Sequence, residues 1–252
     1  MSRHHKQKLL ALAVVLTLGV IGTGAPAFAA AEYHQPVWFT WEKSVLDVLI
    51  IPPNHGQIVN GRGVLGGLDP RELSPYENSY LRATEKSAAD WDRAIDAYGA
   101  TWLKAGLVTN IYVVGRDTIP NAALVNPEIV ITTDEGKGPV LGITFSSRPC
   151  LISNSKFFVT SFSYEDMYNV SAHEYGHCLG LDHAYGSPAD GVISHDVIHA
   201  TYEDAVGSVG THLHCMSNLN IKGVERVFGA LFGQPSGGVA VMAPTSYQKI
   251  SC

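Results

Sequence analysis

The segment HEYGHCLGLDH constrains the fold of this chain more than any other part of the sequence. His173 and His177 are four residues apart, so on a helix their imidazoles lie one turn apart on the same face and can bind one metal ion. Gly180 can adopt the left-handed backbone that ends a helix, and the returning chain then brings His183 to the same ion. Glu174 lies beside that ion, where it can act as a base on a water molecule.

The full pattern HExxHxxGxxH is much more restrictive than HExxH, which also occurs by chance on amphipathic helices. It is the zinc signature of the metzincin metallopeptidases, and the chain resembles their matrixin-like branch. The resemblance implies one catalytic Zn2+ ion bound by His173, His177 and His183, with Glu174 as the general base. The sequence leaves open whether a structural Ca2+ ion is bound as well.

The first 29 residues have the features of an export signal. Basic residues precede an apolar run over residues 9–20, and Ala27-Phe28-Ala29 has the small-x-small pattern of a cleavage site. The apolar run is too short for a membrane span, and no later run is long enough. We therefore predict a secreted protein that starts near residue 30 and has no membrane span.

The four cysteines, Cys150, Cys178, Cys215 and Cys252, form an even set in an exported chain, which predicts two disulfides. Three pairings can be drawn. We favour Cys178 with Cys215 and Cys150 with Cys252, because the first would join the metal-binding helix to the C-terminal part and the second would fix the tail.

Strands and helices follow from the pattern of apolar residues. Apolar, β-branched runs predict strands at 45–51, 110–114, 128–133, 141–146 and 150–159. Spacings of three and four predict helices from Asn78 to about Trp102, from Tyr164 to about Leu179, and from Asn220 onward. Ser163 and Asp166 would form a capping box before the second helix.

These elements predict an α+β fold with three layers. A mixed five-stranded sheet would carry a long backing helix, an active-site helix and a C-terminal helix, an order that resembles the metzincin catalytic domain. We divide the chain into a signal peptide (1–29), a lead-in segment (30–44), one metzincin-like zinc peptidase domain (45–232) and a tail (233–252) that looks loosely ordered.

Metzincins place a methionine turn beneath the zinc ion, after the third histidine. Met216 is the methionine between His183 and the C-terminal helix. Counting back from that helix in the matrixin pattern instead puts Ile198 at the methionine position, and we favour Ile198. The residue there supports the site by packing, so the predicted ligands are the same in either case.

Three further motifs are given structural interpretations. Gly61–Gly66 matches GxGxxG, but Asp69 and Pro70 follow where a dinucleotide site needs a helix, so we interpret it as a loop. The sequon at Asn169 is discounted because a glycan there would obstruct the metal. Four more histidines are interpreted as solvated or hydrogen-bonded rather than as a second metal site: His195, His199, His212 and His214.

The sequence thus predicts a secreted, monomeric zinc-dependent endopeptidase that acts on protein or peptide substrates. Removal of the signal changes the formal net charge from −6 to −9, because residues 1–29 hold three of the 17 basic residues and none of the 23 acidic ones, which disfavours nucleic acid as a partner. A zinc hydrolase of a non-peptide amide, from a cell wall or a small molecule, would use the same ligands. A non-catalytic zinc-binding protein is disfavoured because Glu174 is retained.

Overall fold

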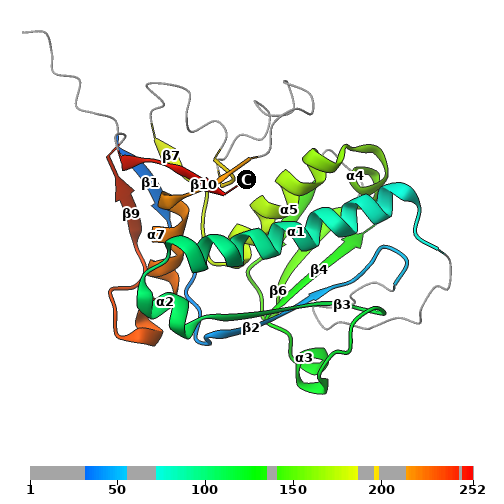
Figure 1. The fold of residues 1–252 in the computed structure, drawn as a ribbon, viewed down its shortest axis with the longest axis horizontal. Helices are drawn as coiled ribbons and strands as arrows, with labels where there is room; N and C mark the ends of the chain where they lie inside the picture. Colours follow the sequence, from blue (N-terminus) through cyan, green and yellow to red (C-terminus); the bar gives the residue numbers. More distant parts are fainter. Residues whose placement is uncertain are drawn as a thin grey trace, which may run out of the picture.

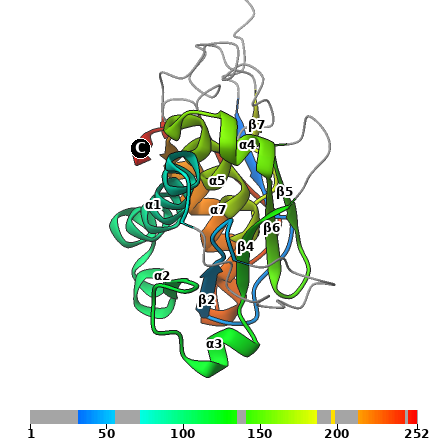
Figure 2. The same cartoon turned by 90° about the vertical axis from the view of Figure 1, so that its right-hand side faces the viewer.

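The computed structural model describes residues 32–55, 72–134, 141–186, 196–198, 214–243 and 246–251. In this part of the chain a five-stranded mixed sheet packs against two helices, and a C-terminal helix lies beside them (Figures 1 and 2). The predicted α+β fold is confirmed. The signal sequence and the GxGxxG segment lie outside the described residues. None of the described helices is long and apolar enough to cross a membrane.

The central sheet contains all five predicted strands. They are β2 (Val45–Ile50), β3 (Val108–Val113), β4 (Ile129–Asp134), β5 (Gly142–Phe145) and β6 (Cys150–Ser155). The order is β3-β2-β4-β6-β5, with β5 antiparallel to β6 and the other pairings parallel. The last predicted strand ends early because the short helix α4 (Lys156–Ser161) begins after Ser155. In this order β5 is an edge strand, and it runs antiparallel to its neighbour β6.

The long backing helix, α1 (Pro75–Tyr98), is shifted towards the N-terminus relative to its predicted range. It begins earlier because Ser74 and Glu77 form a capping box, which satisfies the first backbone N–H groups. It ends before Gly99, and the short helix α2 (Thr101–Gly106) contains Trp102. The short helix α3 (Asn121–Val125) was not predicted and follows β3.

The predicted helix that carries His173 and His177, α5 (Tyr164–Cys178), is confirmed, and Ser163 caps it as half of the predicted capping box. Ser163 Oγ accepts a hydrogen bond from the N–H of Asp166 at 3.1 Å. The helix packs on α1, where the buried indole of Trp91 donates to O of Ala172 at 2.9 Å. α5 therefore lies beside α1 on the sheet, where α5 contacts β5 and β6 and α1 contacts β2 and β3.

Both ends of the described chain are part of the fold. β1 (Tyr33–Pro36) pairs with β7 (Tyr185–Gly186) and with β9 (Val239–Met242), and β8 (Met216–Ser217) pairs with β10 (Lys249–Ser251). The expectation of a loosely ordered tail is therefore wrong. The tail is ordered because its alternating apolar residues pack on β1 and on the C-terminal helix, a contact that no local pattern reveals.

The C-terminal helix, α7 (Asn218–Phe228), begins two residues before its predicted start because Ser217 caps it with Asn220 at the third position. Most of the predicted apolar face is buried, as expected for an amphipathic helix on a core. Leu231 is 37% exposed, because the chain continues after α7 as a 3-10 turn over Gly229–Phe232.

The favoured disulfide pairing is wrong. Cys150 and Cys178 are bonded to each other, with their Cα atoms 5.7 Å apart. The reason is topological: β6 begins at Cys150 beneath the last turn of α5, which ends at Cys178. Cys215 is also disulfide-bonded, and Cys252 lies outside the described residues.

Removing this disulfide should lower stability without changing the fold. The bond closes a loop with a sequence separation of 28, and a loop of that length predicts a loss of about 3.5 kcal/mol in the free energy of unfolding for the double variant Cys150→Ser, Cys178→Ser. Urea denaturation followed by circular dichroism measures it. A denaturation midpoint equal to that of the wild type would contradict the expectation.

Candidate metal centre

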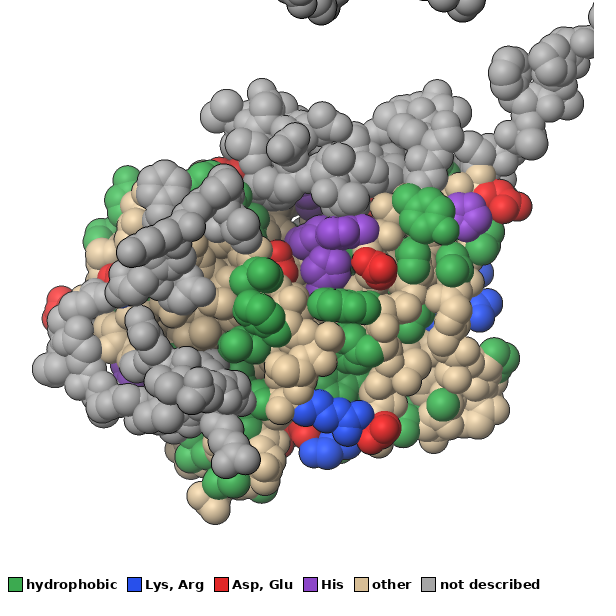
Figure 3. Space-filling model, turned by 180° about the vertical axis from the view of Figure 1, so that it is seen from behind, with side chains coloured by type: hydrophobic (Ala, Val, Ile, Leu, Met, Phe, Trp, Pro, Cys, Tyr) green, Lys and Arg blue, Asp and Glu red, His purple; other side chains and the backbone are tan. Residues whose placement is uncertain are grey.

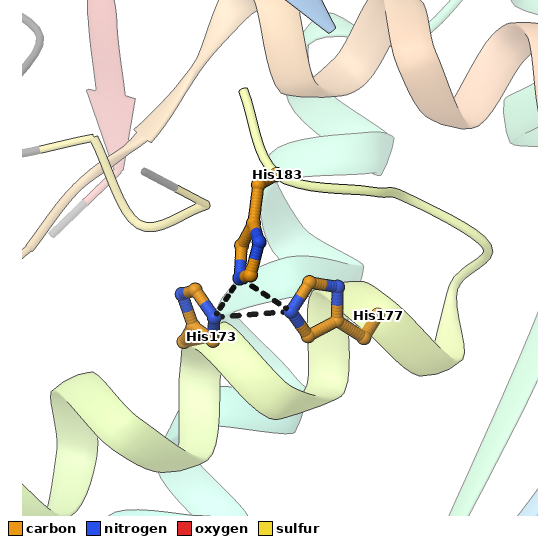
Figure 4. A group of neighbouring side chains, drawn as sticks. All are labelled: His173, His177 and His183. Carbon is orange, nitrogen blue, oxygen red and sulfur yellow. Dashed lines mark hydrogen bonds between the residues drawn. The ribbon is translucent and has the colours of Figure 1, made fainter. Parts of the chain in front are cut away.

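Three imidazole rings converge at the C-terminal half of α5 (Figure 4). His173 and His177 project from successive turns of the helix, and His183 reaches them from the chain that returns after it. Nε2 of His173 and Nε2 of His177 lie 3.0 Å apart, and they lie 3.2 and 3.3 Å from Nε2 of His183. The structure thus brings together the three histidines that the motif spacing predicts to meet.

Backbone carbonyls hold two of these rings. Nδ1 of His173 lies 2.8 Å from O of Val197, and Nδ1 of His177 lies 2.8 Å from O of Leu181. Because a carbonyl oxygen only accepts, each Nδ1 carries the hydrogen, and each Nε2 of a neutral ring presents a lone pair. Two lone pairs at 3.0 Å repel each other unless a cation lies between them. The triad is therefore arranged to hold a metal ion.

The separations fit zinc. A tetrahedral zinc ion binds imidazole nitrogens at about 2.0–2.1 Å, which puts the ligand atoms about 3.3 Å apart. Burial, together with the neighbouring His173, lowers the pKa of His177 to about 4, so this ring is neutral at neutral pH. A neutral imidazole is the form that binds a metal, so the electrostatics agree with the geometry.

Gly180 ends the metal-binding helix as predicted. Its φ of 95° lies in the left-handed region, its N–H donates to O of His177 at 2.9 Å, and a Cβ there would lie 2.7 Å from O of Phe39. Only glycine suits this turn. The turn directs the chain to His183, and the next residue, Leu181, supplies the carbonyl that holds His177.

The segment 196–198 packs against the metal-binding helix. Ile198 is fully buried, and its Cδ1 lies 2.2 Å from where a Cβ on Gly176 would be. Because Gly176 has no side chain, Ile198 lies directly against the helix between His173 and His177. Met216, in β8, is fully buried in the same core, so the choice of Ile198 for the methionine-turn position stays a prediction.

Glu174 lines the same cleft as the three histidines and is 8% exposed. Burial raises its pKa, whereas the hydrogen bond from Thr144 and the nearby histidines act in the opposite direction. Oγ1 of Thr144 lies 2.6 Å from Oε2 of Glu174. Gly142 permits this approach, because a Cβ there would lie 2.9 Å from Cγ of Glu174. The edge strand β5 therefore orients the carboxylate beside the triad.

A cleft of about 430 Å³ contains the triad and Glu174. Figure 3 shows histidine side chains gathered on one face of the molecule, with hydrophobic side chains beside them. One wall of the cleft is β5, through Gly142, Ile143 and Thr144, and Ile143 is 43% exposed. The candidate ligands thus lie next to an apolar surface on an edge strand.

The lead-in segment, for which the sequence indicated no role, forms another wall. The ring of Trp38 is edge-on to the ring of His177, with centroids 5.9 Å apart. The backbone N–H of Trp38 donates to O of Gly180 at 2.8 Å. The indole of Trp41 donates to O of Cys178 at 3.0 Å. The aromatic residues at positions 38, 39 and 41 are the sequence signal that this segment packs on the end of α5.

The additional histidines do not join the triad where they are described. His214 is buried, and its backbone N–H donates to Oδ1 of Asn169 at 2.7 Å. Asn169 is 4% exposed, so the folded protein has no room for a glycan on it, in agreement with the interpretation of the sequon. His195, His199 and His212 lie outside the described residues, so the interpretation of the set stays a prediction.

A larger cavity of about 810 Å³ lies against β2 and β4, away from the histidines. Its charged side chains are paired, Lys43 with Glu128 and Arg148 with Glu42, the latter at 2.9 Å. The hydrogen bond from Arg148 and its charge lower the pKa of Glu42. This cavity therefore combines an apolar wall with charges that already neutralise each other, whereas the three histidines that could hold a metal ion lie in the smaller cleft.

Comparison with known proteins does not assign a function, so the geometry of the histidine triad is the main basis for proposing one. No protein-family model matches the chain, and no curated protein is significantly similar to it. The positive finding is a group of three histidines on and after one helix of an α+β fold, arranged so that it could hold a metal ion.

Proposed function

We propose that the protein is a secreted zinc-dependent endopeptidase of the metzincin type. The observation that carries the proposal is the convergence of three Nε2 atoms at 3.0–3.3 Å beside the oriented carboxylate of Glu174. Three protein ligands leave a fourth position open, as in catalytic rather than structural zinc sites. The Cys150–Cys178 disulfide is consistent with an exported protein.

The proposed roles follow from the contacts. His173, His177 and His183 would hold the ion, which, when bound, lowers the pKa of a water molecule to about 7 and polarises a substrate carbonyl. Glu174 would accept a proton from the attacking water and deliver it to the leaving amine. Burial supports this second role, because a raised pKa makes the protonated carboxyl of Glu174 a more accessible state.

The edge strand supports a peptide as the substrate. Among the described residues β5 pairs with β6 alone, and its exposed residues Ile143 and Phe145 alternate with residues that face α5. An unpaired strand edge offers backbone N–H and C=O groups to an extended chain. A peptide bound along β5 would lie in the cleft that contains the triad and Glu174.

Cleavage of a generic protein tests the proposal. The mature protein should degrade casein, lose this activity in a chelator and regain it when Zn2+ is added back. Cell-wall fragments assayed beside casein separate a peptidase from a hydrolase of non-peptide amides. A protein that binds one zinc ion but cleaves no casein and no member of a peptide library would refute the peptidase assignment.

Thr144→Val should slow catalysis through the orientation of Glu174. The change keeps the shape of the side chain and removes the hydrogen bond to Oε2, a loss of about 1.4 kcal/mol that lowers kcat about tenfold with KM nearly unchanged. Steady-state kinetics on a fluorogenic peptide measure both constants. Thr144→Ser keeps the hydroxyl and should retain most of kcat; equal losses in both variants would contradict this role.

A further inference from the structure

A buried polar cluster, here called the Asp196 network, lies beside the metal centre. Its members are Gln35, Asp196, Ser217, Asn220 and Tyr247, which come from β1, the 196–198 segment, the start of α7 and the tail. All but Tyr247 are at most 1% exposed. No local sequence pattern indicates this cluster, because its residues are far apart in the chain.

The carboxylate of Asp196 is fully hydrogen-bonded. Oδ1 accepts from the N–H of Ile198 at 2.9 Å and from Nδ2 of Asn220 at 3.0 Å, and Oδ2 accepts from Oγ of Ser217 at 2.7 Å and from the hydroxyl of Tyr247 at 2.8 Å. Burial and the neighbouring carboxylate raise the pKa of Tyr247, so its hydroxyl keeps its proton and donates. A buried carboxylate with four donors holds the segments that supply them in fixed positions.

The network reaches His173 through one carbonyl. The bond from the N–H of Ile198 to Asp196 closes a turn, and the residue inside this turn is Val197. The N–H of Val197 donates to O of Cys215 at 3.1 Å, and its O accepts from Nδ1 of His173 at 2.8 Å. Asp196 thus fixes the group that sets the orientation and the tautomer of one imidazole.

The network reaches His183 from the other side. Asn220 Nδ2 donates to Oε1 of Gln35 at 3.0 Å as well as to Asp196, and Nε2 of Gln35 donates to O of Asp182 at 2.5 Å. The N–H of Asp182 donates to O of Pro36 at 3.0 Å. The backbone immediately before His183 is therefore held by the same cluster that holds the carbonyl opposite His173.

We propose that the Asp196 network positions His173 and His183 and thereby sets the affinity and geometry of the metal site. The inference rests on the metal binding proposed above. Asp196, Asn220, Gln35 and Tyr247 are positioning residues, since they act on the imidazoles through backbone carbonyls and touch neither the ligand atoms nor a substrate. Loss of one member should lower metal affinity even when the protein remains folded.

Two variants and a matched control test this role. Asp196→Asn and Tyr247→Phe, which removes one donor, should each weaken zinc binding about tenfold or more, as is typical of changes in outer-shell partners. Tyr168→Phe is the control, because it removes a hydroxyl that donates to another buried carboxylate, that of Asp90, at 2.7 Å. Tyr168 lies on α5, five positions before His173, so the control changes the same helix.

Metal affinity is measured by chelator competition, and the absorption spectrum of the Co2+-loaded protein reports the ligand geometry independently of activity. We expect changed cobalt spectra for Asp196→Asn and Tyr247→Phe and a wild-type spectrum for Tyr168→Phe at a similar loss of thermal stability. If Asp196→Asn does not fold, the comparison of Tyr247→Phe with Tyr168→Phe still tests the positioning role of the Asp196 network.

Two failures are distinguishable. Wild-type affinity and cobalt spectrum in the folded network variants would overturn the positioning role alone. A wild-type protein that binds neither Zn2+ nor Co2+ would overturn the proposed metal site, and the positioning role with it.

Discussion

Glu174→Gln is expected to bind zinc like the wild type and to cleave peptides about 10²- to 10⁴-fold more slowly, the usual contribution of a general base. The amide keeps the size of the side chain and can still accept the hydrogen bond from Thr144, so the cleft keeps its shape. It cannot accept a proton from water. Peptide cleavage and zinc content, measured on the same preparation, test both parts of the prediction.

The matched control is Glu128→Gln. Glu128 is 7% exposed, close to the 8% of Glu174, and it accepts from the N–H of Asp47 at 3.1 Å, a bond that glutamine can keep. Its cleavage rate should equal that of the wild type. Full activity in Glu174→Gln would remove Glu174 from the mechanism, and an equal loss in both variants would indicate a general effect on the fold.

His183→Ala is expected to abolish tight zinc binding and, with it, cleavage. Two nitrogens on one helix face remain, and loss of a ligand should cost more than the roughly 100-fold upper range for outer-shell changes. His34→Ala is the control. His34 lies in the three-stranded sheet β7-β1-β9, here called the small sheet, where it stacks on Tyr185 with 5.0 Å between ring centroids, and it takes no part in the triad. Chelator competition measures both variants.

If His183→Ala held zinc as tightly as the wild type, the third ligand would have to come from another residue, and the turn at Gly180 would lose its proposed purpose. If His34→Ala lost zinc as well, the small sheet rather than the third imidazole would control binding.

The central sheet and the metal helix could be predicted because local pattern determines them. Short apolar, β-branched runs indicated all five strands of the sheet, and Ser163 marked the start of α5. The triad could be predicted for the same reason, since His173, His177 and Gly180 act over a few neighbouring residues.

The remaining features depend on contacts between distant residues. The pairing of Cys150 with Cys178 follows from where β6 begins under α5, which cysteine spacing does not reveal. Thr144 was unremarkable in sequence until β5 was placed against Glu174. The tail looked irregular because its strands are short and their partners, β1 and β8, lie far away in the chain.

The small sheet and the Asp196 network have a consequence for the order of folding. Gln35 and Asn220, which bond to each other, are separated by 185 positions, whereas the two histidines on α5 are separated by one turn. Contacts between such distant residues form slowly, because a long loop must close first. A partly folded molecule would therefore present its histidines before their supports are in place. Hydrolytic competence should accordingly appear late, after the N-terminal and C-terminal strands have met.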